Sequence, residues 1–120
     1  MAPSKLEDAR SAAWANNEIC SKLYNEYGDA VKAAANKGVS ADKDPDAKKC
    51  LKDLNTQFGK FEKSVDALQK EIEKVPINSP DSQKASEAQK DLDLYKKVGL
   101  VVYKRAEEFW QKKYPVKKQK

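Results

Sequence analysis

The fold is decided by residues 45–75, which read PDAKKCLKDLNTQFGKFEKSVDALQKEIEKV. Apolar residues recur here at alternating steps of four and three, at positions 47, 51, 54, 58, 61, 65, 68, 72 and 75. This spacing is typical of one face of a helix and of a heptad seam. Asp44 supplies an N-cap, Pro45 suits the first helical position, and Pro76 ends the run. We therefore predict a helix over 45–75.

The same spacing continues on both sides of this stretch. The upstream seam consists of Leu6, Ala9, Ala13, Asn16, Cys20, Leu23, Tyr27, Ala30 and Ala34. The downstream seam consists of Ala85, Ala88, Leu92, Tyr95, Gly99, Val102, Ala106 and Phe109. Gly38 is a good helix stop, whereas Ser79 and Pro80 repeat the cap-and-proline start and Pro115 closes the pattern. We expect helices over about 5–36 and 80–113.

The predicted fold class is all-α. The breaks at 37–44 and 76–79 are short, and short connections favour antiparallel neighbours. We predict an antiparallel up-down-up three-helix bundle of long helices over residues 1–114, followed by a basic C-terminal tail over 115–120. A break near Gly28 or Gly99 would give a four-helix bundle instead.

Three interior positions carry specific expectations. Gly99 lies on a seam, level with Phe58 and Phe61, and the cost of a helix glycine of about 1 kcal/mol is offset most simply by room for a phenylalanine ring. A hinge at Gly99 is the alternative. Asn16, a polar seam residue, is expected to fix the helix register. Trp14, just off the seam, is expected in the core.

The charge of the chain is concentrated at one end. The net charge is +5, and the segment 112–120 holds five lysines and no acid, which leaves 19 basic and 19 acidic residues elsewhere. The sequence contains no run of 18 apolar residues, so we expect no transmembrane helix. The first ten residues lack the apolar stretch of a secretory signal. With two cysteines, an intracellular, reducing compartment is expected, either the cytoplasm or an organelle interior.

The residue types for common catalytic and metal chemistry are missing. The chain has no histidine, which excludes Ser-His-Asp and Cys-His catalysis and histidine-ligated metals. It has no CxxC pair and no glycine-rich phosphate loop. Asp42, Asp44 and Asp46 are spaced like the start of a calcium loop, but Ala47 replaces its glycine and no bidentate glutamate follows. We expect no enzyme activity, no cofactor and no bound metal.

The third predicted helix has more apolar surface than a bundle requires, in the stretch KKVGLVVYKR at 96–105. One row beside the seam consists of Leu94, Val98 and Val101, and another of Leu100, Tyr103 and Trp110. Contiguous exposed apolar patches mark partner sites. The predicted partner-binding residues are Val98, Leu100, Val101, Tyr103 and Trp110. A broader intramolecular core is the alternative, and an isolated strand is a third reading.

The lysine-rich end adds a second predicted surface. Contact with an acidic surface is expected of Lys112, Lys113, Lys117, Lys118 and Lys120. The leading functional hypothesis is a non-enzymatic accessory or assembly subunit, or adaptor, that docks on a larger protein complex through the third helix, assisted by this tail. The alternative is a polyanion-binding module for nucleic acid or an anionic membrane surface. A solvated end without a partner is the simplest interpretation of the tail.

In length, periodicity and lysine content the chain resembles several small helical-bundle groups. These are spectrin-type repeats, tubulin-binding cofactor A and the extrinsic bundle subunits of photosystem II. No diagnostic motif of these groups matches, and no functional residue is carried over from them.

Overall fold

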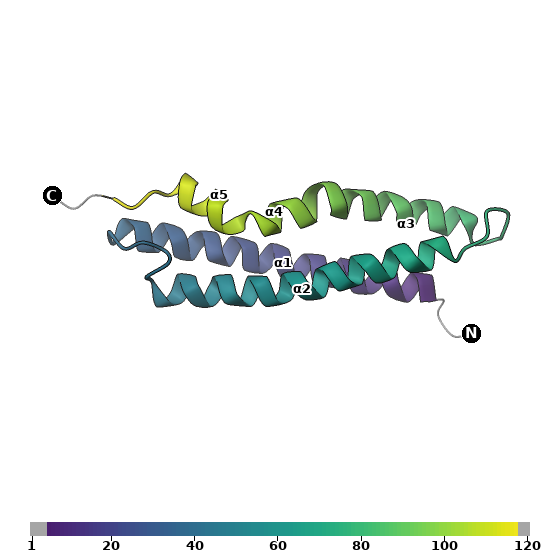
Figure 1. Ribbon diagram of the computed structural model, residues 1–120, viewed down its shortest axis with the longest axis horizontal. Helices are drawn as coiled ribbons and strands as arrows, with labels where there is room; N and C mark the ends of the chain where they lie inside the picture. The colour runs from purple at the N-terminus through teal and green to yellow at the C-terminus, as the bar shows by residue number, and fades with distance from the viewer. Residues whose placement is uncertain (1–4, 118–120) are drawn as a thin grey trace.

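The all-α class is confirmed in a computed structural model, which describes residues 5–117 (Figure 1). Three long segments run side by side in alternating directions, and the molecule extends over 68 × 23 × 15 Å. The first two segments are α1 (Lys5–Asn36) and α2 (Pro45–Glu73). The third is built from α3 (Ser82–Leu94), the π-helix η1 (Tyr95–Gly99), α4 (Leu100–Lys104) and α5 (Ala106–Lys113).

The end of α1 follows from Gly38. This glycine has a φ of 76°, in the left-handed region that costs residues with a side chain energy. Its amide donates to the Ala35 carbonyl at 3.0 Å, and the Val39 amide donates to the Ala34 carbonyl at 2.9 Å. These two hydrogen bonds form a Schellman motif and satisfy the last carbonyls of the helix. The predicted stop at Gly38 is confirmed.

The start of α2 also agrees with the sequence. The Asp44 carboxylate accepts a hydrogen bond from the Ala47 amide at 2.9 Å, and Pro45 occupies the first turn. The third segment begins at Ser82, two residues later than predicted. The reason is that Ser79 belongs to a turn in which both its amide and its hydroxyl donate to the Pro76 carbonyl.

The third segment is wound differently at two places. In η1 the Leu100 amide donates to the Tyr95 carbonyl, five residues back, so that this turn holds one extra residue. At Arg105 the backbone leaves α-helical geometry, with φ −97° and ψ 12°, and α5 starts afresh. The predicted interruption near Gly99 is therefore present as a π turn, whereas α1 passes through Gly28 without a break.

The core runs along the whole bundle between the three segments. Its largest fully buried side chains are Tyr27, Phe61, Leu54, Leu68, Leu92, Val31, Val65 and Cys20. Asn16 accepts a hydrogen bond from the Gln57 amide at 2.8 Å and donates to the Ser64 hydroxyl, which links α1 to α2 at one height. Cys20 and Cys50 are both free thiols.

Two interior expectations have opposite outcomes. A side chain at Gly99 would meet the Phe61 ring at 3.1 Å, which confirms that this glycine makes room for a phenylalanine. The prediction that Trp14 lies in the core is wrong, because its side chain is 56% exposed. Trp14 lines an open recess between α1 and α3, beside Tyr95 and the ion pair that Arg10 forms with Asp91 at 2.9 Å.

Candidate functional site

A polar groove separates α2 from the α4–α5 end of the third segment. Two hollows of about 570 and 800 Å³ form this groove, and they adjoin because Glu107 and Gln111 line both. The groove exists because α5 packs against α1 and leaves the facing side of α2 uncovered. The half-buried side chains of Leu51, Phe58 and Leu100 supply its apolar surface.

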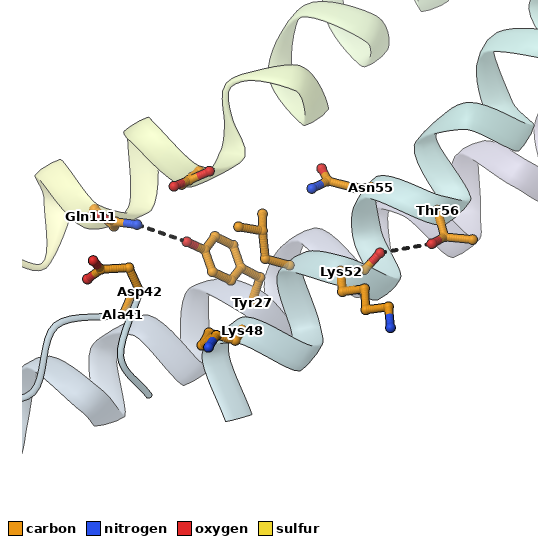
Figure 2. A pocket seen from close by; sticks show the side chains of 10 residues that line it. Tyr27, Ala41, Asp42, Lys48, Lys52, Asn55, Thr56 and Gln111 are labelled. Atoms are coloured by element: carbon orange, nitrogen blue, oxygen red, sulfur yellow. Dashed lines mark hydrogen bonds between the residues drawn. The ribbon is translucent and has the colours of Figure 1, made fainter. Parts of the chain in front are cut away.

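The first hollow is built around the phenol of Tyr27, which is almost fully buried and points from α1 toward α5 (Figure 2). Its oxygen accepts a hydrogen bond from the Gln111 amide at 3.3 Å. Burial raises the pKa of Tyr27; the Gln111 hydrogen bond opposes this rise, and the Glu107 and Asp42 carboxylates each add a smaller rise. The phenol is therefore neutral at physiological pH.

Charges of both signs stand at the rim of this hollow. Lys48 and Lys52 come from α2, Asp42 from the α1–α2 connection and Glu107 from α5. The Ser40 hydroxyl donates a hydrogen bond to Asp42, and this bond is the main reason why the pKa of that carboxyl lies below its usual range. The groove thus offers ionic and hydrogen-bonding groups to a polar surface of mixed charge.

The opposite seam, between α1 and the third segment, is aromatic. The Tyr24 ring lies 5.9 Å from that of Tyr103, 6.2 Å from Phe109 and 5.2 Å from Trp110, measured between ring centroids. Trp110 lies directly on Gly28, where a Cβ would come within 2.5 Å of the indole. The indole Nε1 is buried and has no hydrogen-bond partner. Ring packing of this kind holds α4 and α5 onto α1.

Three of the five predicted partner-binding residues turn inward. The expected exposure of Tyr103 is wrong: its side chain is 9% exposed, and its hydroxyl donates to the Asn17 side-chain oxygen at 2.9 Å. Trp110 is half-buried on Gly28, and Leu100 is half-buried in the polar groove. A continuous α-helical wheel does not hold over this stretch, because the π turn adds one residue at Tyr95–Gly99 and the backbone leaves α-helical geometry again at Arg105.

The other two predicted residues, Val98 and Val101, do reach the surface. They belong to an exposed series on the third segment, the outer row, whose members are 42–58% exposed: Leu94, Val98, Val101 and Phe109. Leu94 stood beside them in the sequence pattern, but Phe109 was expected on the core seam and is found outside it. Trp110 takes the inward place instead, one residue later. Phe109 lies beyond both interruptions of the third segment, so a continuous heptad pattern does not identify it.

Cations flank the outer row near the C-terminus. Arg105 and Lys112 line the same shallow hollow as Val101 and Phe109, together with one acid, Glu108. The Lys113 ammonium lies 5.2 Å from the centroid of the Trp110 ring, with the rings of Phe109 and Tyr114 also close by. The Lys117 amide donates to the Ala35 carbonyl at 3.2 Å, so the start of the tail is attached to α1. Lys118 and Lys120 lie outside the described residues.

Within residues 5–117, no group of three or more His, Cys, Asp or Glu side chains is arranged to hold a metal ion. In the same range, no helix is both long enough and apolar enough to cross a membrane. Burial raises the pKa of the Cys20 thiol to about 11 and keeps it unreactive.

The chain matches no protein-family model, no curated protein and no solved structure.

Proposed function

We propose that this chain is a non-enzymatic helical-bundle subunit that docks on an acidic protein partner through the outer row of its third segment. One observation carries the proposal: four large apolar side chains stand exposed along the third segment, with Leu94, Val98 and Val101 on successive turns and Phe109 about two turns further on. Covering the exposed half of each contributes about 1 kcal/mol at roughly 25 cal/mol per Å². A row of four is therefore enough to drive specific docking when charges add to it.

The flanking charges define the partner. Between residues 94 and 117 the chain carries six lysines and one arginine against two glutamates. Arg105 and Lys112 lie next to Val101 and Phe109, so a partner that covers these apolar side chains also meets the cations. Acidic residues around an apolar strip on the partner would complement this arrangement, increasing the association rate and favouring the right partner.

The double variant Leu94→Lys/Val101→Lys tests the proposal. Both side chains are exposed, so the fold is unaffected while the apolar row is broken. The matched control is Ile19→Lys/Ile77→Lys, which adds the same charge at two exposed isoleucines outside the row. Capture from native extract with quantitative mass spectrometry should show a partner bound by wild type and control but lost from the row variant, and the purified pair should weaken at least about tenfold.

Equal capture by both double variants would contradict the proposal. A partner whose binding is lost entirely at high salt would also contradict the proposal, because binding through an apolar row loses little affinity as ionic strength rises. The polyanion alternative then remains. It predicts that a labelled single-stranded oligonucleotide or an anionic vesicle binds with a steep salt slope. That slope should become shallower when Lys112, Lys113 and Lys117 are changed to Gln.

A further inference from the structure

The wall of α2 that faces the polar groove carries a symmetric pattern of charge. Its residues follow each other at steps of four and three, one position after each residue of the core seam. They form the α2 row: Lys48, Lys52, Asn55, Gly59, Glu62 and Asp66. Two cations stand at one end, two acids at the other, and the two uncharged residues lie between them. Since α2 is an uninterrupted α-helix over Pro45–Glu73, these six positions share one face.

Read from its two ends, the α2 row carries opposite charges at matching positions. Around a centre at position 57, residue 48 corresponds to 66, residue 52 to 62, and residue 55 to 59. Two α2 helices laid antiparallel with these centres together would pair every cation with an acid. Steps of four and three also match the layers of an antiparallel helix pair, in which side chains of the two helices meet at equal heights.

The row is accessible and its charges are available. All of its residues except half-buried Gly59 are exposed. Lys48, Lys52 and Asn55 line the first hollow of the groove, where Figure 2 shows them on α2, and Glu62 lines the second. The ion pairs within residues 5–117 join Arg10, Lys74 and Lys84 to carboxylates elsewhere, so Lys52, Glu62 and Asp66 form none there.

Gly59 is an independent observation that points the same way. A glycine inside a helix costs about 1 kcal/mol relative to alanine. Within residues 5–117, a Cβ at this position would have no atom within 4 Å apart from the backbone of α2 itself, so no packing contact there explains why a side chain is absent. Near the centre of an antiparallel helix pair, a glycine lets the two backbones come close together.

We propose that α2 binds α2 of a second copy of this chain, side by side and antiparallel, through the α2 row. Each copy then places the same surface against the other, as a two-fold dimer requires. From residue 48 to residue 66 the contact is about 27 Å long at a rise of 1.5 Å per residue. The outer row lies on the third segment and stays free for a partner.

Sedimentation equilibrium at low and high salt tests this dimer. Exposed ion pairs are individually weak, so the expected dimer is salt-sensitive and dissociates at dilution. Lys52→Glu should weaken it by about tenfold or more, because two opposed acids replace each 52–62 pair. Glu62→Lys should weaken it equally. The combination Lys52→Glu/Glu62→Lys should restore dimerisation, because the pairs re-form with reversed sign. Lys60→Glu, an exposed charge change off the row, is the control and should leave the dimer intact.

Disulfide trapping tests the register and direction. In a Cys50→Ser background, a chain with Asn55→Cys mixed with a chain with Gly59→Cys should form the mixed disulfide faster than either chain forms its own. Residue 55 is level with 59 of an antiparallel partner, whereas a parallel pair would join like to like. A chain that is monomeric at low salt and high concentration, a charge swap that restores nothing, or disulfides only between like residues would each overturn the proposal.

Discussion

Glycines at two places in this bundle do opposite things. Where the third segment packs on the bundle, Gly28 of α1 and Gly99 leave spaces that are filled by the rings of Trp110 and of Phe61 from α2. On the outward side of α2, Gly59 leaves a space that no other part of residues 5–117 fills. A helix glycine costs about 1 kcal/mol in both settings. Close packing of a ring accompanies Gly28 and Gly99, whereas no packing contact in the described part of the chain accompanies Gly59.

The difference also separates surfaces that are packed within the chain from surfaces that have no packing partner in it. Rings close the inner side of the third segment: Phe61 of α2 lies beside Tyr95 and Tyr103, and Tyr24 of α1 lies beside Trp110. On the α2 side, charged and amide side chains face the polar groove without a packing partner. The stability change on substituting each glycine by alanine therefore reports whether another side chain of the chain occupies its space.

Gly28→Ala is the strongest test and should destabilise the fold by about 2 kcal/mol. The new methyl carbon would come within 2.5–2.7 Å of three carbons of the Trp110 indole, so the ring must move. Overpacking of this kind costs about 1–3 kcal/mol, which exceeds the gain in helix propensity. Urea denaturation followed by circular dichroism measures the change in unfolding free energy.

The background variant Trp110→Leu is the control for Gly28→Ala. With the indole removed, the alanine has room, and the substitution should become neutral or stabilising. If Gly28→Ala costs the same in both backgrounds, the indole is not what excludes a side chain at this position. The comparison between closed and open glycines would then lose its main support.

Gly99→Ala should cost less, about 1 kcal/mol. A methyl group here would meet two carbons of the Phe61 ring at 3.1 and 3.2 Å, a shortfall of only a few tenths of an ångström. Phe61 has little freedom to move, because the rings of Tyr95 and Tyr103 lie 5.4 and 5.8 Å from it. Thermal and urea unfolding should both report this small loss. A stabilised variant would show that the Phe61 ring can yield.

The sequence predicted the contact between Gly99 and the Phe61 ring because the apolar residues of both helices are regularly spaced. The seam over 45–75 predicted α2 to within two residues, and the height comparison placed Gly99 beside Phe61. The same reasoning failed just after Gly99. Its leading prediction treated 80–113 as one continuous α-helix, whereas the π turn at Tyr95–Gly99 and the break at Arg105 interrupt it, and Tyr103 is buried while Phe109 is exposed. A heptad pattern contains no sign of one extra residue in a turn.

The candidate surfaces were also predicted only in part. Val98 and Val101 were identified because a single helix has only one buried face, which is a local argument. The polar groove was not identified, because it depends on α5 packing against α1 rather than α2. That choice rests on the fit of Trp110 to Gly28, a contact between residues 82 positions apart that no local pattern reveals.

Gly59→Ala is the smallest and the most discriminating change. In dilute solution it should stabilise the monomer by about 0.5–1 kcal/mol, because the methyl group meets no atom and the helix gains propensity. At high concentration the same methyl group should weaken self-association, because it lies near the centre of the antiparallel α2 pair. Urea unfolding of the dilute chain and sedimentation of the concentrated chain measure the two effects separately. A variant that gains stability and dimerises as well as wild type would show that the two copies do not approach closely at Gly59, while a variant that loses stability when dilute would show that α2 already fills this space from within.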